Sequence, residues 1–235
     1  MTFDKPNVLS QGKSTASPKA TPTKNGPDFG KYGLADYNEE TVLEPSERER
    51  RNRTSKRYDN EGWVTANPHP ETAVIGRVTE NEPPPVIPTD ESELIVTGKV
   101  VKVTAHLSND KGGVYSEFTV KVGQILKNNL SIELERDSLI TLDRAGGVVR
   151  YPNGQEVLYE DSQRGLPEEG REYAFFLCAD KKSENYKILT LYDLQETKIV
   201  PLDSGRAADD IKRMGKSDFL QTVRGKLSQP KDRKP

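Results

Sequence analysis

The sequence predicts an all-β protein, an antiparallel β-barrel over residues 93–202 with a C-terminal helix. Three observations predict it. Residues 93–107 form a long β-branched run with Gly98 inside, and residues 113–127 alternate strictly between apolar and polar side chains. Several further short strand-like segments follow, separated by polar turns, and only one helical pattern closes the chain, which is typical of a small closed or partly open barrel.

The region ahead of the barrel has a different composition. Only 32% of the 235 residues are hydrophobic and 31% are charged, and 11 of the 16 prolines lie in residues 1–91. Such a composition buries too little apolar surface to fold, so residues 1–57 are predicted to be a disordered tail. The tail contains a basic tract at 48–57, RERRNRTSKR, where a short helix over about 44–57 is expected with Ser46 as its N-cap.

Residues 58–92 are predicted to be a Trp-containing segment followed by a proline-rich linker. Trp63 is the only tryptophan, and we expect it to pack on the barrel because an exposed Trp on a free tail is unusual. The run ENEPPPVIPTDES at 80–92 predicts an extended polyproline connection.

The barrel strands follow in order. Gly98 predicts a bulge or bend in the first strand. In the second strand, residues from Val114 to Val122 alternate toward the core, which leaves Tyr115 and Lys121 on the opposite, exposed face. The remaining strands are predicted at 138–144, in a hairpin at 146–160, and at 171–180, 185–194 and 197–202. Residues 203–235 are predicted as a connector, an amphipathic helix over 216–227 with Ser217 as N-cap, and a disordered end.

The barrel region resembles a known family. The stretches VTGKVVKVTAHLSNDKGGVYSEFTVKVGQILKN, LPEEGREYAFFL and NYKILTLYDLQETKIVPL are similar to the OB-like barrels of netrin/TIMP type found in uncharacterised bacterial proteins. The resemblance covers about residues 93–202, extends to the closing FLQTVRGKL, and implies an OB-like fold. The chain lacks the N-terminal cysteine and the disulfides through which animal TIMPs reach a metalloproteinase zinc, so the resemblance does not imply that activity.

Catalytic, metal and cofactor chemistry find little support in the sequence. The pair His106 and Ser108 has no third group to orient it, and the adjacent acids Asp209/Asp210 and Glu168/Glu169 stand in polar loops. In HLSNDKGG, at 106–113, only Asp110 fits a calcium loop, and the glycine pairs lack phosphate-loop spacing. The lone Cys178 is typical of a small buried hydrophobe. We therefore expect no enzyme, no cofactor and no metal site.

Two binding functions remain. A tethered barrel presenting its loops 106–113 and 160–170, or the open edge of an incomplete barrel, favours a non-enzymatic interaction module for a protein partner that the sequence does not identify. The alternative is a single-stranded nucleic-acid binder, although a net charge of −2 and many interleaved acids disfavour it. The candidate contact residues for either partner are Arg48, Arg50, Arg51, Arg53, Tyr115, Lys121, Arg150 and Tyr151.

Localisation follows from what the sequence lacks. No apolar run approaches the roughly 18 residues that span a membrane, and residues 1–15 lack the apolar region of a signal peptide. As written the chain predicts a cytoplasmic protein without membrane insertion. An exported or periplasmic protein whose signal was removed, or lies upstream, would have the same sequence.

Overall fold

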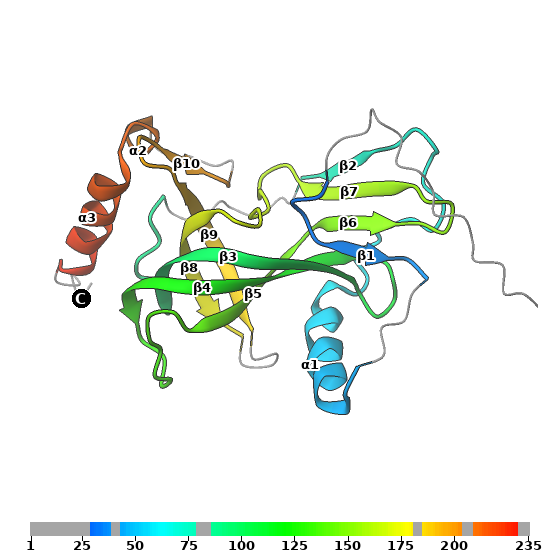
Figure 1. Cartoon of the computed structure of the whole chain (residues 1–235), viewed down its shortest axis with the longest axis horizontal. Helices are drawn as coiled ribbons and strands as arrows, with labels where there is room; N and C mark the ends of the chain where they lie inside the picture. The colour runs from blue at the N-terminus through cyan, green and yellow to red at the C-terminus, as the bar shows by residue number, and fades with distance from the viewer. Residues whose placement is uncertain (1–28, 39–42, 79–85, 181–184, 204–208, 230–235) are drawn as a thin grey trace, which may run out of the picture.

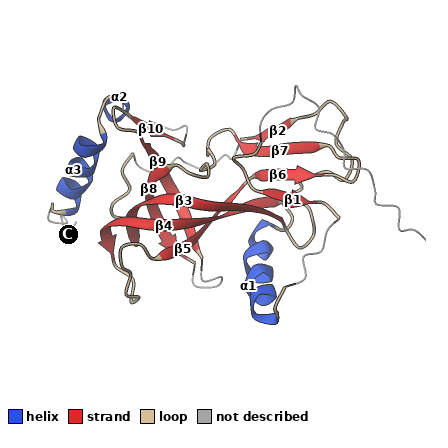
Figure 2. Cartoon of the chain, viewed as in Figure 1, coloured by secondary structure: helices blue, strands red, loops and turns tan. Residues whose placement is uncertain are grey.

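The fold consists of two β-sheets side by side, and helices α1 (Pro45–Ser55) and α3 (Lys216–Leu227) both pack on the larger one (Figure 1). A computed structural model of the chain describes residues 29–38, 43–78, 86–180, 185–203 and 209–229. Strands and their connections make up most of this structure, as Figure 2 shows. No helix in these described ranges is long and apolar enough to cross a membrane.

The larger sheet closes into a five-stranded barrel. The strands pair in the order β3-β4-β5-β9-β8, and β8 pairs with β3 again. These strands confirm the five predicted ranges to within a residue or two: β3 (Leu94–Leu107), β4 (Val114–Asn128), β5 (Leu139–Ala145), β8 (Glu172–Ala179) and β9 (Tyr186–Leu194). The barrel interior is apolar, with Phe118, Leu142 and Phe175 fully buried.

Two details of the barrel correct the prediction. The pair β5–β9 is parallel, with Leu142 opposite Tyr186, whereas every other pair in the barrel is antiparallel. The barrel is closed by the pairing of β8 with residues 94–99 of β3, so the incomplete barrel considered for edge binding is not observed. The predicted last strand is confirmed as β10 (Ile199–Pro201), which extends the sheet along the far end of β9.

Gly98 lets β3 cross β4 closely. The register between the two strands shifts on both sides of this residue, so the predicted bulge is confirmed. A Cβ atom at position 98 would lie 2.5 Å from Cγ1 of Val120 and 2.9 Å from the carbonyl oxygen of Lys121. Only glycine fits this approach without displacing the neighbouring backbone.

The smaller sheet contains a hairpin that was predicted to belong to the barrel. Strands β6 (Gly147–Arg150) and β7 (Glu156–Asp161) pair in a four-stranded sheet of order β1-β6-β7-β2. Its outer strands are β1 (Leu34–Asp36) and β2 (Val74–Arg77), which both pair in parallel. The chain leaves the barrel at Gly146, whose φ of 110° is a conformation that glycine adopts readily and side-chain residues rarely do.

The N-terminal region is structured where it is described. Helix α1 (Pro45–Ser55) confirms the short predicted helix, and a single 3₁₀ turn, η1 (Lys56–Tyr58), follows it. The N-cap is Glu44, with Pro45 in the first turn, so the prediction of Ser46 is wrong. The predicted disordered tail is likewise wrong for residues 29–38 and 43–57, because α1 is fixed to the barrel by ion pairs. The rest of that prediction, 1–28 and 39–42, lies outside the described residues.

Side chains ahead of the barrel complete two apolar clusters outside it. The rings of Trp63 and Tyr159 meet edge to face with centroids 5.7 Å apart, so Trp63 is packed as predicted, but its ring partner lies on β7 of the smaller sheet and not on the barrel. Residues 79–85 of the predicted linker lie outside the described structure. Residues 86–92 are packed rather than extended in solvent, since Ile87 and Ser92 are buried.

The C-terminal helix covers one end of the barrel. Helix α3 (Lys216–Leu227) confirms the predicted range, although its N-cap is Gly215 and not Ser217. Phe219, Leu220 and Val223 are buried against the outer face of β8 and β9, where Phe219 meets Tyr192. The connector before it contains one short helical turn, α2 (Asp209–Lys212).

Candidate functional site

The basic tract is docked on the barrel rather than free. Arg50 donates hydrogen bonds to Glu117 at 3.0 Å and to Asn185 at 2.9 Å, and pairs with Glu47 on its own helix. Arg53 pairs with Glu49, one helical turn away. The prediction that residues 48–57 belong to a disordered tail is therefore wrong.

Two other residues of the tract have separate surroundings. Arg48 is exposed on α1, and its guanidinium donates to the carbonyl of Leu43 at 3.2 Å. Arg51 is half-buried, and its Nε–H has no acceptor among the described residues. The four candidate arginines therefore do not form one surface.

The aromatic candidates are buried. Tyr115 has no exposed surface, its ring stacks on Tyr58 at 4.6 Å, and its hydroxyl lies 2.8 Å from that of Ser55. Tyr151 is 4% exposed, and its hydroxyl contacts that of Tyr159 at 2.6 Å. The alternation in β4 assigned Tyr115 to the outer face correctly, but α1 and η1 cover that face. The prediction that these rings face solvent is wrong.

Arg150 and Lys121 are the exposed candidates on strands, and they lie on different sheets. Arg150 is on β6, where Glu156 accepts from its guanidinium at 2.9 Å. Lys121 is on β4 of the barrel and pairs with Asp137 at 3.0 Å. The candidate residues thus do not converge on one site, and only Lys121 belongs to an extended basic surface.

We call that surface the basic face. Lys121 stands directly opposite Lys99 on β3 and directly opposite Leu139 on β5, so the three side chains form one row across three strands. In the next row β3 has a bulge between Val100 and Lys102, and both Val101 and Lys102 are exposed there. The basic face comprises Lys99, Val101, Lys102, Lys121 and Leu139, all exposed.

The charges of the basic face are only partly neutralised. Like charges directly opposite each other destabilise a sheet, and Lys99 faces Lys121 in this way. Glu172 lies opposite Lys99 on the other side, but its carboxylate accepts from Lys216 at 2.6 Å. Neither Lys99 nor Lys102 has a carboxylate partner in the described part of the chain. The apolar Leu139 beside them is 64% exposed.

A second feature is a cavity where the barrel meets the smaller sheet, which we call the arginine cavity. Its volume is about 220 Å³. Five of its lining side chains are cationic and three are anionic. The cations are Arg57, Arg77, Arg144, Arg164 and Lys187, and the anions are Glu61, Asp143 and Asp161.

Three of these arginines are held by carboxylates. Arg57 donates to Asp143 at 2.6 Å, Arg77 to Glu61 at 2.8 Å, and Arg144 to Asp203 at 2.6 Å. The Asp143 carboxylate has no exposed surface and also accepts from the Tyr58 hydroxyl. Burial raises the pKa of Asp143, and the Arg57 charge and the two hydrogen bonds counter only part of that effect.

The other two cations have no carboxylate partner among the described residues. Arg164 is half-buried in the connection from β7 to β8, and Lys187 is exposed on β9. The loop of Arg164 is fixed, since Arg144 donates to the carbonyl of Gly165 at 2.8 Å. Two cations without a described carboxylate partner therefore face the cavity.

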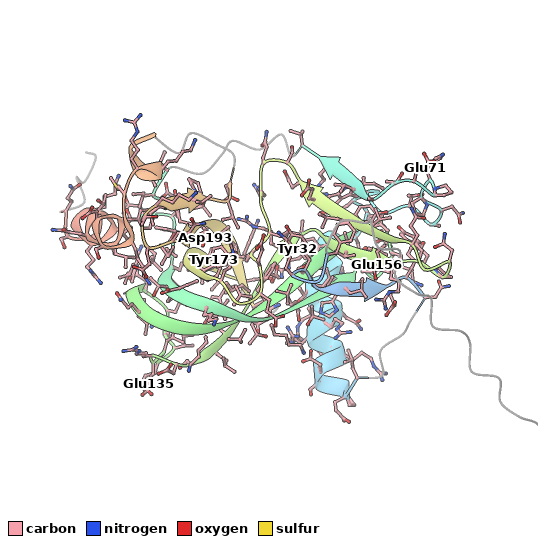
Figure 3. All side chains as sticks on the ribbon, turned by 45° about the horizontal axis from the view of Figure 1, so that its top comes forward. Tyr32, Glu71, Glu135, Glu156, Tyr173 and Asp193 are labelled. Atoms are coloured by element: carbon pink, nitrogen blue, oxygen red, sulfur yellow. The ribbon has the colours of Figure 1, made fainter. Side chains whose placement is uncertain are left out.

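A second cavity, of about 280 Å³, lies on the other side of the same loop. Its lining includes Tyr32, Tyr173 and Asp193, of which Tyr173 and Asp193 are opposite one another on β8 and β9 (Figure 3). Arg171 pairs with Asp193, and Glu168 pairs with Lys31. Loop 160–170, predicted to face a partner, thus forms a wall of both cavities.

The loop at 106–113 is held by the preceding segment. The amides of Trp63 and Val64 both donate to the carbonyl of Gly112, and the amide of Asn60 donates to Asp110. Ser108 donates to Asp110 at 2.6 Å and so stabilises the turn. His106 is buried with its Nε2 3.5 Å from Glu117. Nowhere in the described ranges do three or more His, Cys, Asp or Glu side chains group closely enough to bind a metal.

Few signals in the sequence point to the residues that form these two features. The pairing of Lys99 with Lys121 depends on three one-residue register shifts between β3 and β4. The arginine cavity joins residues from η1, both sheets and a loop, which no local pattern connects. Comparison of the sequence with protein-family models and with curated proteins finds no match.

Proposed function

We propose that the protein is a non-enzymatic binding module that docks an acidic, apolar segment of a partner protein on the basic face. The observation that carries the proposal is the row of Lys99, Lys121 and Leu139 on the outside of the barrel. A positive surface with exposed apolar side chains beside the lysines complements a polypeptide that presents carboxylates next to an apolar anchor.

The same proposal includes an OB-like barrel. If the five barrel strands are numbered one to five along the chain, they close in the order 1-2-3-5-4, with strands three and five parallel. This arrangement supports the fold implied by the resemblance to netrin/TIMP-type barrels. OB-like barrels bind their ligands on an exposed strand face, and the basic face occupies strands one to three.

A single-stranded nucleic acid is the second candidate ligand, and the same lysine row favours it. Such ligands are held by stacking on aromatic rings as well as by cations, at about 1–3 kcal/mol per stacked base. The rings predicted for that role, Tyr115 and Tyr151, are buried. The exposed side chains beside the lysines are the aliphatic Val101 and Leu139, which suit a polypeptide better.

Fluorescence anisotropy separates the two ligands. The probes are a labelled peptide of glutamates interrupted by leucines, the same peptide with glutamine for glutamate, and a labelled oligo(dT). We expect the acidic peptide to bind, the glutamine peptide to bind at least ten-fold more weakly, and Lys99→Glu/Lys121→Glu to abolish binding. Leu139→Ser tests the apolar anchor, and Lys226→Glu on exposed α3 is the matched control.

Each outcome decides between the candidates. Tighter binding of oligo(dT) than of the acidic peptide, lost in the double lysine variant, would replace the protein partner by nucleic acid. Equal binding of all probes by wild type and the double variant would reject the basic face as a binding surface for either.

A further inference from the structure

We infer that the arginine cavity is a binding site for a phosphate group, separate from the basic face. Its lining carries five cations and three anions. Arg57 and Arg144 also pair with Asp180 and Asp203, which do not line the cavity, so the group as a whole holds five carboxylates for five cations. The two cations without a described carboxylate partner, Arg164 and Lys187, match the charge of a phosphate dianion.

The size of the cavity limits the ligand. A water molecule occupies about 30 Å³ in the liquid, so 220 Å³ holds about seven waters or one small oxyanion with a few waters. Sites for drug-sized ligands begin at about 300 Å³. The cavity therefore has room for inorganic phosphate or for the phosphate group of a terminal phosphomonoester.

The cavity is also organised in advance. Arg57, Arg77 and Arg144 come from three different elements, and each is fixed by a carboxylate at 2.6 to 2.8 Å. Arg77 additionally lies over the ring of Trp63, 3.9 Å from its centroid. Fixed guanidinium groups on several sides suit a tetrahedral oxyanion, whose oxygens accept hydrogen bonds in several directions.

Three buried donors add to the positive potential. The Nε–H groups of Arg57, Arg77 and Arg144 have no acceptor among the described residues. They are shielded from solvent, so their role is electrostatic rather than direct contact. We assign direct contact with the phosphate to Arg164 and Lys187, because neither side chain would have to leave a described carboxylate partner to bind it.

Isothermal titration calorimetry at constant ionic strength tests the inference with the full chain. The probes are inorganic phosphate, O-phosphoserine and acetate. We expect both phosphate probes to bind and acetate not to bind. Lys187→Gln and Arg164→Gln should each weaken phosphate binding about 10-fold or more, the effect of losing one charge-assisted hydrogen bond, and the double variant about 100-fold.

Controls separate binding from folding and from general charge. Lys226→Gln removes an exposed lysine from α3 and should leave phosphate affinity unchanged. Arg164→Lys keeps the charge and should bind more tightly than Arg164→Gln. Acetate binding as tight as phosphate, or phosphate binding unchanged in the double variant, would overturn the inference. Binding of inorganic phosphate but not O-phosphoserine would identify the free anion as the ligand.

The two proposals fail independently. Loss of phosphate binding in the Arg164 and Lys187 variants leaves the basic face intact, and the Lys99/Lys121 double variant leaves the cavity intact. A protein that binds phosphate but no acidic peptide would therefore retain the cavity and lose only the proposed docking function.

Discussion

Arg57 and Asp143 are 86 residues apart in the chain, yet the Arg57 guanidinium donates a hydrogen bond of 2.6 Å to the Asp143 carboxylate. This ion pair fixes the end of the α1–η1 segment to β5 and forms one wall of the arginine cavity. Glu117 and Arg50 fix the helix itself in the same manner. A segment whose composition predicts disorder is thus held to the barrel by carboxylates on barrel strands.

Asp143→Asn tests the strength of this attachment. The substitution keeps the shape of the side chain but removes the charge that faces Arg57, which retains only Asp180. We expect the free energy of unfolding to fall by about 2 kcal/mol, because Arg57 and Tyr58 lose a charged acceptor, and relief of the Asp143 desolvation offsets only part of that loss. Urea denaturation measures it. Asp137→Asn, in an exposed pair with Lys121, is the control and should change little.

Acid should weaken the attachment through Glu117. Burial alone would raise the pKa of Glu117, but hydrogen bonds from His106 and Arg50 outweigh it and lower the pKa to about 2. A depressed pKa stabilises the fold above the unfolded value of 4.5, and that contribution, about 3 kcal/mol, is lost as the pH falls toward 2. In Glu117→Gln the deficit in unfolding free energy should be full at pH 6 and shrink below pH 4.5. A deficit that stays constant with pH would contradict this assignment.

Two glycines should respond oppositely to alanine. Gly98→Ala places a Cβ atom 2.9 Å from the carbonyl oxygen of Lys121, and we expect a loss of about 2 kcal/mol from overpacking. Gly225 lies in α3 with nothing within 4 Å of the added carbon. Gly225→Ala should therefore stabilise the protein by about 0.5–1 kcal/mol through helix propensity. Thermal unfolding of both variants checks the signs.

Removal of the region ahead of the barrel should damage the fold. A fragment of residues 92–235 lacks α1, β1, β2 and Trp63. The missing residues cover an apolar cluster that is buried in the full chain and would become partly exposed in the fragment. Its members are Val114, Val149, Val157 and Tyr159. We expect the fragment to bind a hydrophobic dye and to melt over a broad range. A sharp transition at the melting temperature of the full chain would show that the barrel does not need its N-terminal cover.

The barrel strands could be predicted from the sequence because each carries its own signal. The β-branched run around Gly98 and the alternation from Val114 to Val122 specify β3 and β4 without reference to other parts of the chain. The outer strands of the smaller sheet could not be predicted, since β1 and β2 have three and four residues and pair in parallel with distant strands. Too few residues are present there for a period to be detected.

The candidate site was harder to predict than the fold. Alternation in β4 identified the side of the sheet on which Tyr115 lies, but whether that side is exposed to solvent depends on where α1 packs. Nothing local in RERRNRTSKR indicates that Arg50 and Arg57 meet Glu117 and Asp143. Lys121 was identified because the alternation of its own strand predicts its exposure. That Lys99 lies opposite it depends on the register shifts between β3 and β4, which no local pattern indicates.

The pairing of β1 with β6 has a consequence for how the protein is made. Leu34 pairs with Val148, a separation of 148 − 34 = 114 residues. At a synthesis rate of roughly 5–20 residues per second, Leu34 leaves the ribosome on the order of 6–23 s before its partner. During that interval β1 has no strand to join, and such non-local pairing also slows folding of the complete chain. Strand β1 is therefore synthesised early and pairs late, and in between it is exposed to proteases and chaperones.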